Sequence, residues 1–239
     1  MPHAPLQAVL FDLDDTLHDD TANYERAARD VAEEVAHERA VDADALWHAY
    51  LIEAQLFWVH LSERDFVVPL GGVRTQMWLR ALRTVGLDDL PLAERAADDY
   101  NRYRKRYLAL FPGALEALAA LRARGLKLGM ITNGFAETHR EKITLLQLDD
   151  AFDEIFIADE VGMIKPDPRI FEHACERLGA PVRSTAMVGD RFDRDIRGGQ
   201  AAGLYTVWLN RRGEHVPHGA APPDAMVDDI TAVAGVLPP

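Results

Sequence analysis

The chain has 239 residues, 48% of them hydrophobic, which is enough to bury a core in one large domain or two small ones. Its formal net charge of −13 argues against a nucleic-acid partner, because binding to a phosphate backbone relies on clustered lysine and arginine. No apolar run reaches the roughly 18 residues that span a bilayer, and the start shows no signal-peptide pattern. We therefore expect a cytoplasmic protein with no membrane partner.

The first predicted strand ends in a cluster of acidic residues. Asp12 lies within the apolar run from Ala8 to Leu13, and Asp14 and Asp15 follow that run directly. Carboxylates this close repel one another, and burying them is costly unless a cation and hydrogen-bond donors compensate. Mg²⁺ is the cation that we expect, because it prefers carboxylate oxygens and shares its shell with water and substrate phosphate. In an open α/β sheet, ligands bind beyond the carboxyl ends of the strands, where this cluster falls.

A helical insert follows the first strand. From Ala22 to about Arg106, apolar residues recur at helical spacing and no strand-like alternation persists. The pattern predicts helices around 24–35, 46–61 and 77–85, with a break at 67–73 that contains one proline and two glycines. Three tryptophans of the insert, Trp47, Trp58 and Trp78, are expected mostly to pack between these helices, although one of them could cover a substrate's base or sugar.

The most basic window of the chain lies near the end of the insert, from Arg102 to Arg106. We interpret it as the solvated face of a helix whose tyrosines pack inward. The alternative is that one of these arginines steers a second anionic group of a substrate.

Strands and helices alternate from residue 111 onward, which implies βαβ units and a parallel sheet. The predicted strands are 127–131, 154–158, 186–188, 206–209 and 225–227, and the predicted helices are 114–124, 137–146, 168–178 and 193–202. Cys175, the one cysteine, falls in the apolar stripe of the third of these helices and is predicted to be a buried core thiol. The fold class is thus α/β, a doubly wound parallel sheet with a helical cap. Residues 1–20 and 108–239 would form the core domain and 21–107 the cap domain.

Three further motifs carry polar residues at or after predicted strands. Thr132-Asn133-Gly134 ends one strand, Lys165 lies in a loop before Pro166, and Gly189-Asp190 ends another strand, with Asp195 five residues later. Each alone has a simple explanation: a turn, a solvated lysine, or a helix entry with Asp193 as its N-cap. Their order along the chain favours one catalytic site.

With these motifs, the chain resembles the haloacid dehalogenase-like hydrolases. The family's four motifs are matched in order and spacing by Asp12-x-Asp14-x-Thr16, by Thr132 with Asn133, by Lys165, and by Gly189-Asp190 with Asp195. The stretch 111–208 is the most specific part and looks like the phosphatase branch that carries a helical cap after the first motif. Within it, residues 131–142 are similar to pyrimidine 5′-nucleotidases and N-acylneuraminate-9-phosphate phosphatases.

The resemblance implies Mg²⁺-dependent hydrolysis of a small phosphate monoester. Asp12 would be the nucleophile that forms an aspartyl-phosphate. Asp14 would protonate the leaving oxygen and then deprotonate water, and we expect neighbouring carboxylates to raise its pKa for that task. The Thr132 hydroxyl and the Asn133 backbone N–H would hold phosphoryl oxygens, with Lys165 as the catalytic cation beside them and Asp12. The metal ligands would be Asp12, the backbone oxygen of Asp14, Asp190 and Asp195, the last directly or through water.

Four positions fall outside the pattern or leave their role open. Arg191 stands where the family usually has a small hydroxyl residue, and pairing with Asp193 or Asp195 is favoured over contact with substrate. His139 replaces the glutamine of the nucleotidase-like relatives, which weakens the transfer of their specificity. His18 begins the linker to the insert, where polar surface is the ordinary interpretation and a place at the pocket entrance the alternative. Thr16 is expected to hydrogen-bond the loop backbone.

Three other functions stay open on the same sequence. A haloacid dehalogenase would use the same nucleophile without a metal and would not be expected to keep Asp14 and the Thr132-Asn133 phosphate grip. A phosphosugar mutase would need a cap that holds a phosphorylated intermediate for re-use. A non-catalytic phosphate-binding regulator would have no need of Asp12. The expected partner is a small phosphorylated metabolite, with a nucleoside monophosphate or a phosphosugar favoured, and the protein is expected to be a monomer or a homodimer.

Overall fold

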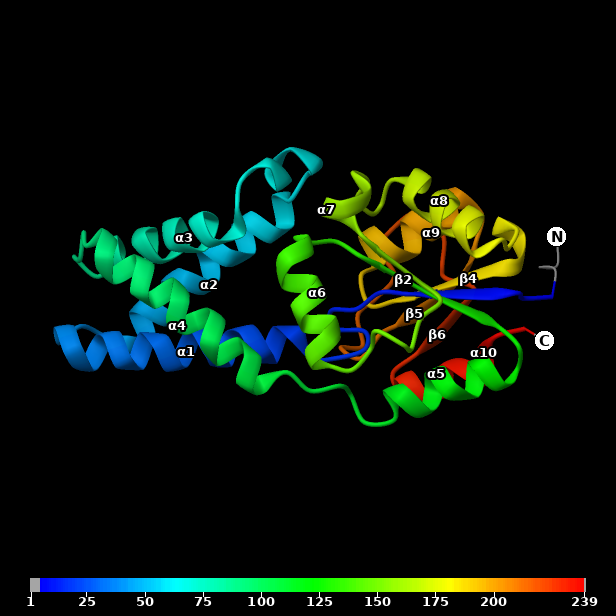
Figure 1. The fold of residues 1–239 in the computed structure, drawn as a ribbon, viewed down its shortest axis with the longest axis horizontal. Helices are drawn as coiled ribbons and strands as arrows, with labels where there is room; N and C mark the ends of the chain where they lie inside the picture. The colour runs from blue at the N-terminus through cyan, green and yellow to red at the C-terminus, as the bar shows by residue number, and fades with distance from the viewer. Residues whose placement is uncertain (1–4, 239) are drawn as a thin grey trace. The chain divides into compact units, whose positions relative to one another are not determined.

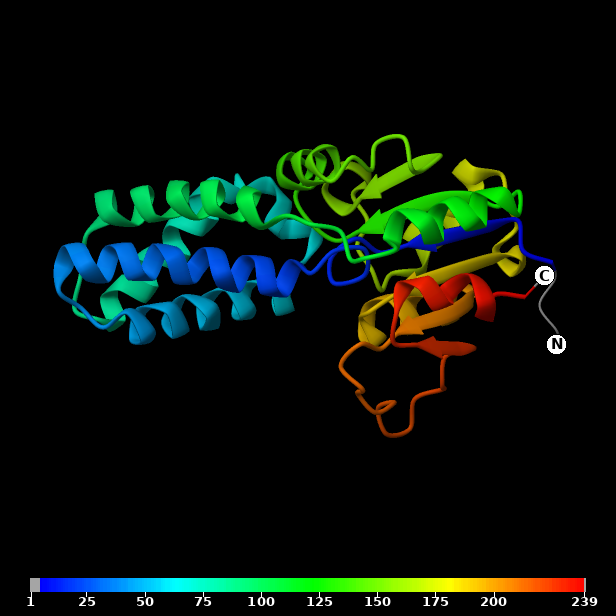
Figure 2. The same cartoon turned by 90° about the horizontal axis from the view of Figure 1, so that it is seen from below.

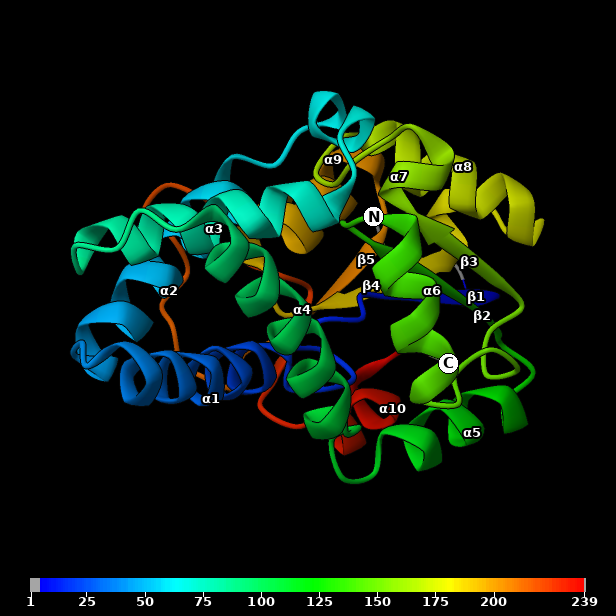
Figure 3. The same cartoon turned by 60° about the vertical axis from the view of Figure 1, so that its left-hand side comes forward.

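The computed structural model describes residues 5–238, and the chain divides into two compact units. One unit joins the residues up to Asp19 with those from Ala109 onward, and the other is Asp20–Leu108. Each unit has its own elements and its own hydrophobic core, and Figures 1 and 3 label the main elements of both.

The first unit is built on a six-stranded sheet in the order β3-β2-β1-β4-β5-β6. Its strands are β1 (Ala8–Phe11), β2 (Lys127–Thr132), β3 (Glu154–Ile157), β4 (Thr185–Gly189), β5 (Tyr205–Leu209) and β6 (Ala225–Val227). Every neighbouring pair is parallel. The chain adds β2 and β3 on one side of β1 and then β4 to β6 on the other. The predicted doubly wound parallel sheet is therefore confirmed.

Helices cover both faces of this sheet. Helices α5 (Ala114–Ala123) and α10 (Val233–Val236) lie on one side, and α8 (Pro168–Leu178) and α9 (Arg197–Ala202) lie on the other (Figure 1). Strand β1 is buried along its whole length, as a central parallel strand with both faces covered should be. Helix α8 turns its apolar stripe toward the sheet, and Cys175 on that stripe is 2% exposed. The predicted core thiol is confirmed, and burial raises its pKa.

The predicted helix 193–202 is divided in the structure. Its first part, Phe192–Ile196, is a π-helical turn, and α9 continues from Arg197. The N–H groups of Asp195 and Ile196 both approach the carbonyl of Arg191, at 2.8 and 3.4 Å, so one acceptor serves two successive donors. Single π turns of this kind recur at functional sites, and this one carries Asp195.

The second unit is a bundle of four long helices, α1 (Asp20–Arg39), α2 (Ala43–His60), α3 (Leu70–Thr84) and α4 (Leu90–Tyr107), with a short 3₁₀ turn at Glu63–Val67. Helices α1 and α3 each pack against both α2 and α4 (Figure 2). Their core holds an aromatic stack in which the ring centroids of Tyr50 and Trp78 lie 4.0 Å apart. Among residues 5–238 no helix has both the length and the apolar character needed to cross a membrane.

The predicted break at 67–73 is wrong in its extent, because α3 already begins at Leu70. Gly71 and Gly72 lie in its first turn, where N–H groups need no intrahelical partner, and the buried side chain of Leu70 anchors that turn. The basic window is as predicted for a solvated face: Arg102 is exposed and pairs with Asp99, whereas two of the three tyrosines of α4, Tyr100 and Tyr103, are buried and Tyr107 is half-buried.

Candidate active site

The predicted site residues of the first unit meet at the carboxyl ends of three adjacent strands. Asp12 follows β1 directly, Thr132 ends β2, and Asp190 follows β4. Strand β1 lies between β2 and β4, at the point where the chain switches from one side of the sheet to the other. Open α/β sheets bind their ligands at such switch points.

Lys165 connects Asp12 to a second buried carboxylate. Its Nζ lies 2.6 Å from Asp12 Oδ1 and 2.7 Å from Asp195 Oδ1, and all three side chains are buried. Burial alone would lower the pKa of Lys165, but attraction to Asp12 and Asp195 outweighs it and raises that pKa. The ammonium is therefore a fixed positive charge against Asp12.

Asp195 is held as firmly as Lys165. Its Oδ1 accepts the bond from Lys165, and its Oδ2 accepts a 2.9 Å hydrogen bond from the backbone N–H of Arg191. Gly189 permits this approach, since a Cβ at that position would lie 2.3 Å from Asp195 Cγ. The Gly189-Asp190 motif thus needs its glycine for the packing of Asp195.

Asp12, Asp190 and Asp195 form a cluster in which each offers an oxygen within 4.8 Å of the others. Burial raises the pKa of Asp12 to about 6, with Lys165 opposing and Asp195 and Asp14 adding to the rise. Burial, together with repulsion from Asp12 and Asp195, also holds the pKa of Asp190 well above its ordinary value. A divalent cation fits this cluster, because hard oxygen ligands are present and their mutual repulsion is under-compensated.

Thr16 and Arg191 lie as predicted. The hydroxyl of Thr16 accepts a 3.1 Å hydrogen bond from the backbone N–H of Asp190, so it ties the loop after β1 to the loop after β4. Arg191 donates from Nε to Asp193 at 3.2 Å, which confirms the pairing that was favoured for it. The bond from Thr16 helps to set the place of Asp190 in the cluster.

Asp14 has surroundings that the sequence did not predict. Its Oδ1 lies 2.8 Å from His18 Nε2 and 2.6 Å from Lys142 Nζ, and its Oδ2 lies 3.3 Å from His139 Nε2. Burial favours the neutral acid, but the charge of Lys142 and hydrogen bonds from His139 and His18 hold the Asp14 pKa well below its usual range. The expected rise is wrong, because Lys142, His139 and His18 contact the Asp14 carboxylate and favour its ionised form.

Two of these neighbours correct the sequence interpretation. His18 is completely buried, so it is not polar linker surface. Lys142 was not singled out at all, yet it is 2% exposed. Its signal in the sequence is the spacing from His139, three residues along the predicted helix, which places both side chains on one face.

Thr132 and Asn133 lie at the same edge as Asp12. Thr132 is the last residue of β2 and is buried, and it is two residues beyond Met130, the register partner of Phe11. The Asn133 side chain hydrogen-bonds the main chain of Lys165, at 2.8 and 2.9 Å. This side-chain contact adds a second task to the phosphate-binding role that the motif predicts for the Asn133 backbone.

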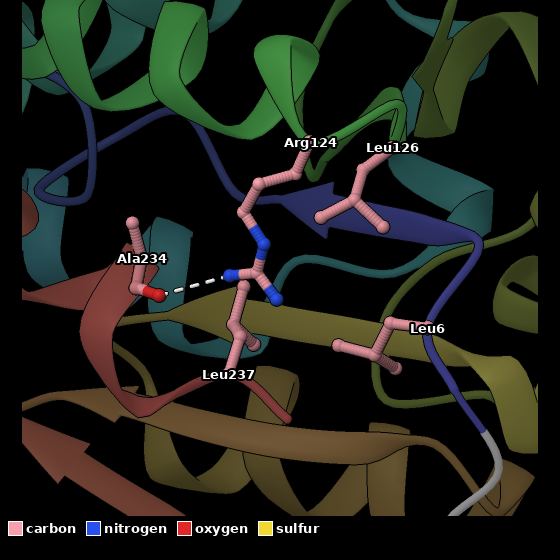
Figure 4. Close-up of a pocket in the computed structure, with 5 residues that line it drawn as sticks. All are labelled: Leu6, Arg124, Leu126, Ala234 and Leu237. Carbon is pink, nitrogen blue, oxygen red and sulfur yellow. Dashed lines mark hydrogen bonds between the residues drawn. The ribbon is translucent and has the colours of Figure 1, made fainter. Parts of the chain in front are cut away.

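A separate pocket lies at the opposite end of the sheet, where β1 and β2 begin. It is lined by Leu6, Arg124, Leu126, Ala234 and Leu237 (Figure 4). Arg124 donates to the carbonyls of Ala234 and Pro238, at 2.9 and 2.8 Å, so its cation anchors the C-terminal segment. This pocket is otherwise apolar and far from the carboxylates in the fold, and it holds none of the predicted site residues.

Several proteins of known activity are similar to this chain. It is 35% identical to glyceraldehyde 3-phosphate phosphatase of Methanopyrus kandleri over 88% of this chain and 86% of that protein. It is 33% identical to N-acylneuraminate-9-phosphatase of Mus musculus over 97% and 94% of the two chains. A pyrimidine 5′-nucleotidase of Escherichia coli is 45% identical over 46% of this chain and 49% of that protein.

Solved structures share the fold over nearly the whole length. A Bacillus subtilis HAD-hydrolase bound to magnesium matches with a TM-score of 0.77 and 24% identity, over 98% of this chain and 99% of that one. A 2-haloacid dehalogenase of Pseudomonas syringae matches with a TM-score of 0.67 and 29% identity, over 97% of both. The family model for haloacid dehalogenase-like hydrolases matches residues 6–203. With its motifs gathered at one edge of the sheet, the chain belongs to the haloacid dehalogenase-like hydrolase family.

Proposed function

We propose that the protein is a Mg²⁺-dependent phosphatase that hydrolyses a small phosphate monoester through a phosphorylated Asp12. The observation that carries the proposal is the contact between Lys165 and Asp12 inside the buried carboxylate cluster. A carboxylate that is to attack phosphorus must lie beside positive charge, because phosphoryl transfer is catalysed mainly by positioning and electrostatic stabilisation. The named activities of the similar curated proteins agree with this reaction class.

In the first step, an Asp12 carboxylate oxygen attacks phosphorus and the bond from phosphorus to the leaving oxygen breaks. The Thr132 hydroxyl and the Asn133 N–H would hold the phosphoryl oxygens while Lys165 offsets their charge. Asp14, whose carboxylate pairs with Lys142 in the substrate-free protein, would have to take up a proton before it could pass one to the leaving oxygen. In the second step, water attacks the phosphorus of the phosphorylated Asp12, Asp14 takes a proton of that water, and the bond between phosphorus and the Asp12 oxygen breaks, which releases phosphate and free Asp12.

The residues that would hold the cation are Asp12, Asp190 and the backbone oxygen of Asp14. Asp195 would contribute through water, because both of its oxygens already accept hydrogen bonds, from Lys165 and from the Arg191 backbone. When bound, Mg²⁺ would neutralise negative charge on the nucleophile and the phosphoryl group. Hard oxygen ligands favour Mg²⁺ over zinc in this cluster.

We infer that the helical unit, residues 21–107, is the cap domain and that the substrate is small. The similar curated phosphatases are named for glyceraldehyde 3-phosphate, a pyrimidine nucleotide and an N-acylneuraminate 9-phosphate. A nucleoside monophosphate or a phosphosugar is therefore the substrate class that we favour, in a cytoplasmic monomer or homodimer. A closing cap excludes water and also excludes polymers.

The structural likeness to a 2-haloacid dehalogenase makes dehalogenation the second candidate. Both reactions use a carboxylate nucleophile, so Asp12 does not distinguish them. The distinguishing feature is the acidic cluster with Asp190, whose raised pKa favours a cation that dehalogenation does not need.

Turnover of p-nitrophenyl phosphate tests the proposal. Activity should vanish in EDTA, return with Mg²⁺ and stay low with Ca²⁺, whose looser coordination misplaces the attack. 2-Chloropropionate should not be consumed. Undiminished activity after exhaustive chelation, or release of chloride, would instead support the dehalogenase.

A panel of phosphorylated metabolites tests the substrate class. It compares nucleoside monophosphates and phosphosugars with phosphopeptides and oligonucleotides, and preference for the larger substrates would contradict the cap role.

A further inference from the structure

The helical unit buries an arginine that has no carboxylate partner. Arg74, in the second turn of α3, is 5% exposed, although long charged side chains are almost never buried so deeply unless they are paired. Among residues 5–238, no carboxylate oxygen lies within 4.0 Å of its guanidinium, and its one hydrogen bond runs from Nη1 to Oδ1 of Asn101 on α4. A neutral amide cannot balance the charge of a buried cation.

The wider surroundings of Arg74 do not balance that charge either. Burial lowers the pKa of Arg74 to about 10, and the neighbouring cation of Arg104 adds to the fall. Tyr100, Tyr50 and Asp20 act in the opposite direction without offsetting it. With a pKa near 10 the guanidinium still carries its proton at neutral pH. Arg74 is therefore a buried positive charge that the helical unit compensates only in part.

The side chains beside Arg74 add hydrogen-bond donors rather than acceptors. The guanidinium carbon lies 5.5 Å from the centre of the Tyr100 ring, and Trp78, one turn further along α3, lies 6.4 Å from that ring. Trp78 is completely buried, and its indole N–H has no hydrogen-bond partner within the described part of the chain. Asn101 uses its amide oxygen on Arg74, which leaves its NH₂ group as a further donor. The cluster lacks negative charge and acceptor oxygens, and a ligand that supplies both would complete it.

We propose that Arg74 and Asn101 bind the carboxylate group of a small ligand in the helical unit. A guanidinium presents two parallel N–H donors that match the two oxygens of a carboxylate, and such charge-assisted bonds are stronger than neutral ones. A monoanion also matches the single charge of Arg74, whereas a phosphate dianion would leave negative charge uncompensated in a buried place. The carboxylate belongs either to the substrate of the proposed phosphatase or to a separate metabolite, and two arms of one experiment distinguish these sources.

The binding arm titrates the full chain, in the presence of Mg²⁺, with sodium benzoate and follows the benzoate signals by NMR. Benzoate supplies a carboxylate without a phosphate, so this arm does not depend on catalysis. Arg74→Met should raise the Kd for benzoate at least about tenfold, because a charge-assisted contact is lost. Arg80→Met is the matched control, since Arg80 lies on the same helix but is exposed and pairs with Glu53. It should bind benzoate as tightly as the unmodified protein.

Asn101→Leu is the second variant and serves alone if Arg74→Met does not fold, which circular dichroism establishes. It removes the amide but keeps the guanidinium, so it should also raise the Kd for benzoate, by a smaller factor than Arg74→Met.

The kinetic arm rests on the proposed phosphatase function and compares kcat/KM for 4-carboxyphenyl phosphate with that for phenyl phosphate. A ratio that falls about tenfold in Arg74→Met and stays unchanged in Arg80→Met would assign the carboxylate to the substrate. An unchanged ratio with Arg74-dependent benzoate binding would assign it to a separate metabolite. Benzoate binding and a substrate ratio that are both independent of Arg74 and Asn101 would overturn the proposed site. Failure of the phosphatase proposal is recognised separately, as absence of Mg²⁺-dependent turnover of either substrate by the unmodified protein, and the binding arm would still decide the site.

Discussion

The side chain of Asn133 holds the main chain of Lys165 at both of its polar groups. Asn133 Nδ2 donates to the Lys165 carbonyl at 2.8 Å, and Asn133 Oδ1 accepts from the Lys165 N–H at 2.9 Å. The two residues follow different strands, yet this pair of bonds fixes the loop from which Lys165 reaches Asp12. The side-chain amide of Asn133 therefore positions the Lys165 ammonium.

We predict that Asn133→Ala lowers kcat/KM by about 100-fold, because Lys165 would lose its place beside Asp12. Stability should fall by about 1–3 kcal/mol for the unsatisfied buried partners. Asn210→Ala is the matched control, since Asn210 makes the same double contact with the main chain of Glu214, at 2.8 Å for each bond. Urea denaturation and steady-state kinetics check both variants. An equal loss of activity in both would show that Asn133 acts only through stability.

The two carboxylates of the first motif should differ in what their loss costs. Asp12→Asn should retain the fold and lose at least about a thousandfold in kcat, because an amide cannot form the acyl-phosphate. Asp14→Asn should lose about 10²–10⁴-fold, the usual contribution of general acid–base catalysis. Circular dichroism establishes the fold, and phosphate release measures the rates. Near-normal turnover by purified Asp12→Asn would exclude the mechanism.

The last residue of β4 gives a steric prediction. Gly189→Ala would place a methyl group 2.3 Å from Asp195 Cγ, so the carboxylate that holds Lys165 must move. We expect a loss of about 1–3 kcal/mol in stability from overpacking, together with a large loss of kcat. Gly235→Ala is the control, because nothing lies within 4 Å of a Cβ there, and it should be neutral or slightly stabilising. A fully active Gly189→Ala would show that Asp195 tolerates displacement.

The sequence predicted what depends on periodicity and on short motifs. Each sheet strand was placed within two residues, because a buried parallel strand reads as a continuous apolar run between turn residues. The motif residues Asp12, Lys165 and Asp190 could be assembled because carboxyl ends of parallel strands meet at one edge. Both results need only local patterns and the topology that they imply.

The neighbours of Asp14 could not be predicted in the same way. The Lys142 contact spans 128 residues of sequence, and it depends on how α6 (Ala136–Leu145) turns about its own axis after β2. A helical face can be read from spacing, but the group that it meets is decided by packing. The pKa of Asp14 was therefore predicted in the wrong direction from its sequence neighbours alone. The division of the predicted helix 193–202 likewise depends on the hydrogen bonds of Arg191 and Asp195.

The carboxylate cluster leads to a prediction for the pH dependence of stability in metal-free protein. The Asp12 pKa is raised from 3.8 to about 6 by burial, so the folded state binds this proton more tightly than the unfolded state. Its contribution to stability is fully present below the unfolded pKa and is lost as pH rises through about 6. Added Mg²⁺ should restore stability at higher pH, because the cation compensates the ionised carboxylates.

Comparison with Asp12→Asn isolates this contribution, since the amide stays neutral. In EDTA, the variant should become more stable than the unmodified protein by about 1–3 kcal/mol as pH rises from about 4 to 7. Mg²⁺ should close that difference.

Asp14→Asn supplies a control of opposite sign, because the Asp14 pKa is lowered and its ionised form stabilises the fold. That variant should be less stable near neutral pH, and the deficit should shrink as pH falls below the ordinary carboxyl pKa. Urea denaturation at each pH measures both differences. A difference between Asp12→Asn and the unmodified protein that is independent of pH and of Mg²⁺ would show that Asp12 is not part of an under-compensated cation site.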